Sequence, residues 1–89
     1  MSNLKYSASL VPPGEIIKDE LKARRLTQKS LAEMMRIPYA RLNRIVNAQM
    51  PVSPGFALAL EATLGISAEM LTNIQKRYDM QTVEQMKKA

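Results

Sequence analysis

Residues 26–47 hold two short amphipathic segments joined by a very short turn, and this spacing restricts the chain to few folds. Only Arg36 and Ile37 remain between the two segments. The pattern predicts helices over about 28–35 and 38–47, joined by a tight turn. Each helix has its apolar residues at helical spacing on one face: Leu31, Ala32 and Met35 in the first, and Leu42, Ile45 and Val46 in the second.

Local signals mark the start of both helices. Thr27 is a good N-cap acceptor, and Leu26 before it is placed to contact Leu31 as a hydrophobic staple. Pro38 fixes a helical backbone angle at a position that needs no amide donor. We therefore expect Pro38 in the first turn of the second helix.

The second helix directs polar side chains outward once its apolar face is buried. Arginine can present two donors to guanine, asparagine matches adenine, and tyrosine can contact a phosphate or a thymine methyl group. This layout is typical of a helix-turn-helix unit that reads the major groove of DNA. The alternative is that the arginines are simply solvated surface residues. The side chains expected to face outward are Tyr39, Ala40, Arg41, Asn43 and Arg44.

The distribution of charge favours the DNA-binding interpretation. Residues 1–49 carry nine Lys and Arg against four Asp and Glu, whereas residues 50–89 carry four of each. The whole net charge of +5 therefore lies in the half with the two short helices, and such a surplus attracts phosphate. Gln28 is placed to bind a phosphate oxygen together with the free amides of the helix end, although a solvated first-turn side chain fits the sequence equally well.

Composition limits the other functions open to the chain. Its 89 residues suffice for one compact domain, and they include no cysteine and no histidine. Disulfides, thiolate metal sites and the commonest general base are therefore excluded, and no phosphate-binding loop or nucleophile motif is present. We expect no enzymatic activity, no cofactor and no metal. The sequence also lacks an apolar run of membrane-spanning length and a hydrophobic signal region, so we expect no membrane partner and a cytoplasmic location.

Further helices are expected before and after this pair, because apolar residues recur there at helical spacing. They run over about 14–24 and 54–64, and from a Ser67 cap through about Tyr78. The chain is thus predicted to be all-α, with five helices in one domain over residues 12–80.

The two ends of the chain are expected to be less regular. Residues 1–11 are interpreted as a flexible arm and residues 81–89 as a polar tail that frays. The last helix has a second stripe of residues beside its core face, with Met70, Asn73 and Arg77. This stripe suits a second copy of the chain, and ordinary core packing is the alternative.

Several short motifs are shared with a known family. The most specific are the opening Pro13-Gly14-Glu15-Ile16 and the segment Asn73-Ile74-Gln75 to Tyr78-Asp79. Other matching positions are Leu26-Thr27-Gln28 with Leu31-Ala32, Ile37-Pro38 through Leu42, Ile45 and Asn47, then Ala57-Leu58-Ala59-Leu60, Leu64-Gly65 and Ser67-Ala68-Glu69. In these motifs the sequence resembles the lambda-repressor-like (XRE) helix-turn-helix proteins, and within them the HigA/VapI antitoxin branch.

The resemblance implies a five-helix DNA-binding domain and an autorepressor that binds an inverted repeat in double-stranded DNA as a homodimer. It also implies a partner toxin, a RelE-like mRNA interferase of the HigB type. By the same resemblance, Asn47 would lie near a phosphate. The positions that would face DNA are Gln28, Tyr39, Ala40, Arg41 and Arg44.

Three positions depart from the family pattern. Relatives often have glycine at the turn position of Arg36 and after the recognition helix, where this chain has Ala48, and an aromatic residue at Met70. A left-handed backbone at Arg36 would cost about 1 kcal/mol. Two other functions fit the same residues: a stand-alone phage-type or chromosomal repressor without a toxin, and a helical protein-interaction module that no longer binds DNA.

Overall fold

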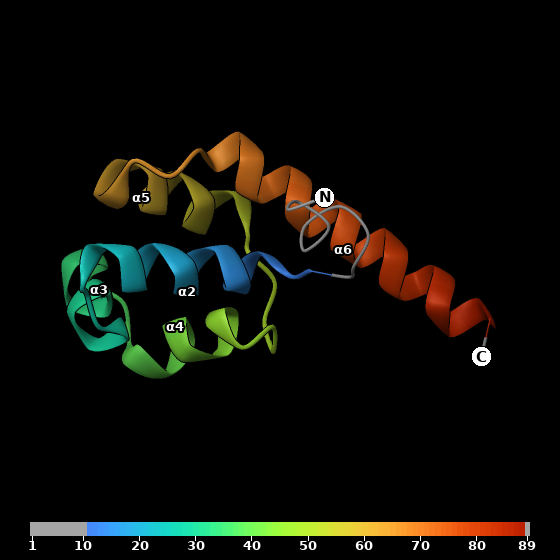
Figure 1. Ribbon diagram of the computed structural model, residues 1–89, viewed down its shortest axis with the longest axis horizontal. Helices are drawn as coiled ribbons and strands as arrows, with labels where there is room; N and C mark the ends of the chain where they lie inside the picture. Colours follow the sequence, from blue (N-terminus) through green and yellow to red (C-terminus); the bar gives the residue numbers. More distant parts are fainter. Residues whose placement is uncertain (1–10, 89) are drawn as a thin grey trace.

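The computed structural model describes residues 11–88, and these residues form five helices and no strand. The expectation of an all-α chain is confirmed, while the arm expected over residues 1–11 lies, except for Val11, outside the described residues. Within the described residues, no helix combines the length and apolar character needed to cross a bilayer. The helices are α2 (Pro13–Arg24), α3 (Gln28–Met35), α4 (Tyr39–Val46), α5 (Pro54–Leu64) and α6 (Ala68–Lys88) (Figure 1).

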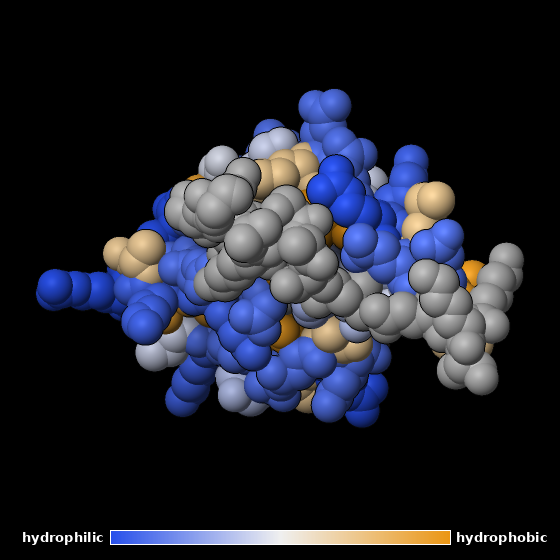
Figure 2. Space-filling view, turned by 45° about the vertical axis from the view of Figure 1, so that its right-hand side comes forward, coloured by the Kyte–Doolittle hydropathy of each residue, from blue (hydrophilic) through white to orange (hydrophobic). Residues whose placement is uncertain are grey.

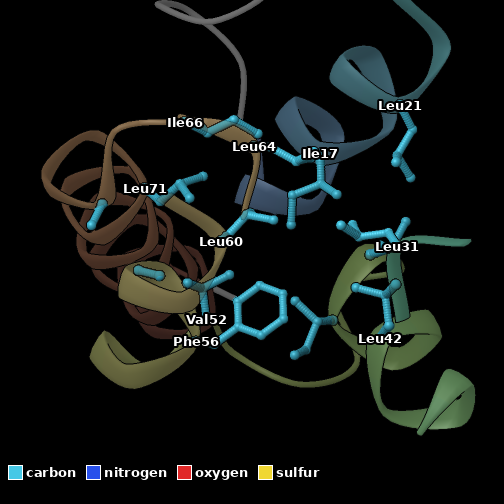
Figure 3. Close-up of a cluster of buried hydrophobic side chains, with 14 of the residues drawn as sticks. Ile17, Leu21, Leu31, Leu42, Val52, Phe56, Leu60, Leu64, Ile66 and Leu71 are labelled. Carbon is cyan, nitrogen blue, oxygen red and sulfur yellow. The ribbon is translucent and has the colours of Figure 1, made fainter. Parts of the chain in front are cut away.

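The core forms where the apolar faces of all five helices meet. Figure 1 shows α2 in the middle of the molecule, and α2 packs against both α4 and α6. The helix pairs α3 and α4, α3 and α5, and α5 and α6 are also in contact. Figure 3 shows the buried side chains pointing toward one another from these elements. The most completely buried residues are Ile17, Leu31, Leu42, Ile45, Val46, Leu60 and Leu71.

The helices begin close to the residues that the sequence predicts, with a shift of one position at the start of α4. Ser53 Oγ accepts a hydrogen bond from the Phe56 amide at 3.1 Å, and Ser67 Oγ accepts one from the Met70 amide at 3.1 Å. Pro38, expected inside the first turn of α4, is instead its N-cap residue, with an extended backbone of φ −62° and ψ 140°. A proline there still suits the helix start, because its missing amide costs no hydrogen bond.

The end of α6 corrects the sequence analysis. The helix was expected to end near Tyr78, with a fraying tail over residues 81–89, yet it continues to Lys88. Residues 79–88 contain no glycine or proline and are mostly good helix formers, so nothing stops the helix at Tyr78. The Thr82 hydroxyl also donates a hydrogen bond back to the Tyr78 carbonyl at 2.8 Å. In Figure 1 this part of α6 runs beyond the other helices.

Candidate DNA-binding interface

The start of α3 is fixed by the predicted cap. Thr27 Oγ1 accepts a hydrogen bond from the Ser30 amide at 3.0 Å, and the partly buried Leu26 packs against the core. Gln28, the first residue of α3, is half-buried. The predicted cap is therefore confirmed, and it places Gln28 at the amino end of the helix.

The turn between α3 and α4 depends on a left-handed residue that is not glycine. Arg36 has φ 58° and ψ 44°, and its amide donates to the carbonyls of Ala32 and Glu33. The next amide, of Ile37, donates to the Ala32 carbonyl at 3.0 Å, and the Ile37 side chain packs against the core. The left-handed backbone expected at Arg36 is thus confirmed, and the partly buried Ile37 fixes the turn to the domain.

The far end of α4 lies directly against the start of α2. A Cβ atom built on Gly14 would lie 2.2 Å from the Val46 carbonyl oxygen and 2.9 Å from that of Ile45. Only glycine allows so close an approach of two backbones. Together with Ile37, this contact holds α4 at both of its ends.

The exposed face of α4 carries most of the side chains that the sequence singled out. Tyr39 is 51% exposed, and Ala40, Arg41 and Arg44 are also exposed. Among the described residues, neither Arg41 nor Arg44 forms an ion pair, whereas Lys18 pairs with Glu15 and Arg24 with Glu20 on α2. The two α4 guanidinium groups therefore remain available for an external anion or base edge.

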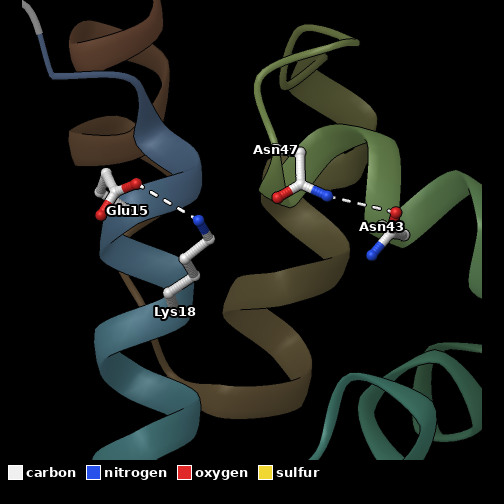
Figure 4. A network of polar contacts seen from close by, with 4 residues as sticks. All are labelled: Glu15, Lys18, Asn43 and Asn47. Carbon is white, nitrogen blue, oxygen red and sulfur yellow. Dashed lines mark hydrogen bonds and ion pairs between the residues drawn. The ribbon is translucent and has the colours of Figure 1, made fainter.

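Asn43 differs from this group. It was expected to face outward, but it is half-buried, and its Nδ2 donates a hydrogen bond to Gln28 Oε1 of α3 at 3.1 Å. Its Oδ1 accepts a hydrogen bond from Asn47 Nδ2 at 3.2 Å (Figure 4). We call these three residues the amide chain. Asn47, which caps the end of α4, is exposed.

A second polar contact, which the sequence analysis did not find, holds the loop after α4. Gln75 of α6 is only 9% exposed, and its Oε1 accepts a hydrogen bond from the Val52 amide at 2.8 Å. Its Nε2 donates to Asp79 Oδ1 at 2.9 Å. The same loop contains Ala48, whose φ of 61° is left-handed. Gln75 and Asp79 belong to the motif that carried the family resemblance, which was the available signal for this contact.

Comparison with known proteins places this arrangement in a family. Residues 17–71 match the family model described as Helix-turn-helix. The chain is 34% identical over 86 residues to Virulence-associated protein I of Dichelobacter nodosus, which covers 96% of this chain and 80% of the relative. It is 25% identical over 72 residues to YddM, an uncharacterized HTH-type transcriptional regulator of Escherichia coli K12, with 81% of this chain and 77% of that protein covered.

Two solved structures have the same fold. A candidate antidote protein of a plasmid maintenance system from Nostoc punctiforme superimposes with a TM-score of 0.82 at 24% identity, covering 88% of this chain and 86% of the other. An addiction module antidote protein of a HigA family from Coxiella burnetii gives a TM-score of 0.79 at 28% identity, with 85% and 84% covered. This chain therefore belongs to the lambda-repressor-like helix-turn-helix family of transcriptional regulators, in the HigA/VapI branch that its motifs indicate.

Proposed function

We propose that this protein is a sequence-specific DNA-binding autorepressor and the antitoxin of a toxin–antitoxin pair. The observation that carries the DNA-binding part is the exposed face of α4, where Arg41 and Arg44 have no carboxylate partner among the described residues. The helix that carries them is held at both ends, by Ile37 before its start and by the contact of Val46 with Gly14 of α2.

In the proposed complex, α4 lies in the major groove of DNA. Arg41 and Arg44 present two donors each to guanine, while Tyr39 and Ala40 contact neighbouring bases or thymine methyl groups. Gln28 binds a phosphate at the start of α3, and Asn47 lies near another phosphate. The phosphate contacts set the position of the protein on the duplex, and the arginines supply the discrimination between bases.

We further propose that the protein binds an inverted repeat as a homodimer that pairs through α6. Met80, Val83 and Met86 are 65%, 50% and 71% exposed and follow one another at intervals of three residues. Figure 2 shows small hydrophobic areas scattered over a mostly hydrophilic surface. A two-fold axis beside Val83 would bring each Met80 against the Met86 of the other copy. The stripe of Met70, Asn73 and Arg77, which the sequence also suggests for pairing, has only one apolar residue of three and is therefore the weaker candidate for the dimer surface.

The antitoxin part of the proposal is supported by the relatives. The Coxiella protein is described as an addiction module antidote of a HigA family, and its structure covers most of this chain. The proposed partner is a RelE-like toxin of the HigB type, encoded beside this gene. Co-purification of the neighbouring gene product with this protein tests the pairing, and its absence would leave a stand-alone repressor.

The DNA-binding part is tested by fluorescence anisotropy. Duplex from the upstream region of the gene and a scrambled duplex of equal length are titrated at two salt concentrations. We expect tight binding to the upstream duplex only, weakening steeply as salt rises because phosphate contacts release counterions. Equal weak binding to both duplexes would contradict the autorepressor, and no binding would indicate a protein-interaction module.

A further inference from the structure

The hydrogen bonds of the amide chain (Gln28, Asn43 and Asn47) all run the same way, with each donor preceding its acceptor from Asn47 to Gln28. Asn47 donates to Asn43, and Asn43 in turn donates to Gln28, at 3.2 Å and 3.1 Å. The oxygen of Gln28 is therefore occupied, and its Nε2 group has no acceptor among the described residues. An amide held in this orientation keeps both N–H donors of its Nε2 group available, and a phosphate oxygen accepts such donors.

The same bonds remove Asn43 from the base-reading face. Its Oδ1 and one of its two amide hydrogens are used inside the protein, and the residue is half-buried between α3 and α4. A bidentate contact with adenine needs the oxygen and the nitrogen of the asparagine side chain aligned together with one base edge. Asn43 is half-buried with both atoms engaged inside the protein, so it is poorly placed for this contact while the amide chain is intact.

We infer that Asn43 is a positioning residue, which orients the Gln28 amide toward a DNA phosphate and does not itself discriminate bases. This inference rests on the proposed DNA binding and adds a division of roles within α4. Arg41 and Arg44 read bases, whereas Asn43 acts through Gln28 on the backbone. Asn47, at the end of α4, orients Asn43 by donating to its oxygen.

The test is a double-mutant cycle on binding to the upstream duplex. Asn43→Ala is expected to weaken binding about threefold to tenfold, the range for one lost hydrogen bond, and by the same factor for every single-base variant of the duplex. Gln28→Ala should weaken binding similarly. The double variant should bind no more than about twofold more weakly than Gln28→Ala alone, because Asn43 acts only through Gln28.

Controls separate positioning from a loss of folded structure. All titrations are made at a temperature where circular dichroism shows every variant to be folded. Asn73→Ala, an exposed asparagine on α6, is the matched control and should leave binding unchanged. Methylphosphonate substitution, one phosphate at a time, should also reveal a single position in each half-site where Asn43→Ala has no further effect.

Two results would overturn the inference. The first is a change of base preference in Asn43→Ala at one base pair, which would make Asn43 a base-reading residue. The second is that the Gln28 and Asn43 substitutions weaken binding independently, so that their two factors multiply in the double variant. In either case wild-type protein that prefers the upstream duplex leaves the proposed function intact, whereas wild-type protein without that preference overturns both.

Discussion

The helices α4 and α6 expose their side chains in opposite structural settings. Helix α4 is eight residues long and is fixed at Ile37 and by the contact between Gly14 and Val46. Helix α6 is 21 residues long, and its second half exposes Met80, Val83 and Met86 beyond the other helices (Figure 1). A helix that must present side chains at defined positions is anchored at both ends, whereas a helix half that extends beyond the other elements is suited to pairing with another chain.

The contact between α2 and α4 is the anchor whose loss should cost most. Gly14→Ala would force a Cβ atom against backbone, which cannot move aside as a side chain can, so we expect a loss of about 3 kcal/mol in the free energy of unfolding. Urea denaturation measures this. Gly55→Ala, where a Cβ meets nothing within 4 Å, is the control and should be neutral or slightly stabilising. Equal stabilities of the two variants would show that the α4 end is not held by this contact.

A substitution in α6 tests whether this helix also holds the loop after α4 in place. Gln75→Leu leaves the Val52 amide without its acceptor, and we expect a loss of about 2 kcal/mol in stability. Thermal and urea unfolding report the change. Gln49→Leu, in the same loop but exposed, should have little effect. A stable Gln75→Leu protein would mean that the loop holds its shape without α6.

On the exposed face of α4, the effect should appear in binding and not in folding. Arg44→Ala is expected to cost about 1 to 3 kcal/mol of specific DNA binding, with relaxed preference at one base pair and little change in stability. Anisotropy titration against single-base variants of the upstream duplex measures both. Arg77→Ala, an exposed arginine of α6, is the matched control for loss of one positive charge. Unchanged affinity and unchanged base preference in Arg44→Ala would remove Arg44 from the proposed readers.

Substitutions at the exposed end of α6 should weaken the proposed pairing of two copies and leave the folding of each copy unchanged. The double substitution Met80→Ser with Val83→Ser removes exposed apolar surface, so monomer stability should hardly change. We expect the dissociation constant of the proposed homodimer to rise about tenfold, or about 1.4 kcal/mol. Sedimentation equilibrium measures it, with Asn73→Ser as the control. A dimer of undiminished strength would place the pairing surface elsewhere.

The smallest expected effect concerns the turn that starts α4. Arg36→Gly should stabilise the protein by about 1 kcal/mol, because glycine adopts the left-handed backbone without the penalty that arginine carries. Ala23→Gly, in the right-handed backbone of α2, should change stability by a similar amount in the opposite direction. Destabilisation by Arg36→Gly would show that the Arg36 side chain makes a compensating contact.

Much of the fold could be predicted from the sequence where local signals and tertiary packing agree. The bounds of α3 were predicted to the residue and those of α4 to within one, because Thr27, the Arg36 turn and the apolar spacing act on neighbouring positions. The left-handed Arg25 was missed, since no glycine marks it. The length of α6 was also missed, because residues 81–89 are mostly polar, and no local signal distinguishes a polar helix that extends beyond the core from a fraying tail.

The sequence predicted which side chains of α4 are exposed, but it did not predict the hydrogen bond between α4 and α3. Helical spacing correctly placed Tyr39, Arg41 and Arg44 on the exposed side of α4. The bond between Asn43 and Gln28 joins residues 15 positions apart, and it exists only once the turn sets the two helices at their observed angle. Periodicity along one helix carries no information about that angle, so the partial burial of Asn43 could not be read from it.

The separation of anchor and exposed face in α4 has an evolutionary consequence. The contacts that hold the helix involve Ile37 and the backbone at Gly14 and Val46, none of which belongs to the face proposed to meet DNA. Substitutions at exposed positions such as Tyr39, Arg41 and Arg44 therefore alter the proposed binding preference without loss of core packing. A duplicated copy of such a gene can acquire a different operator through a few changes and so become independent of its parent.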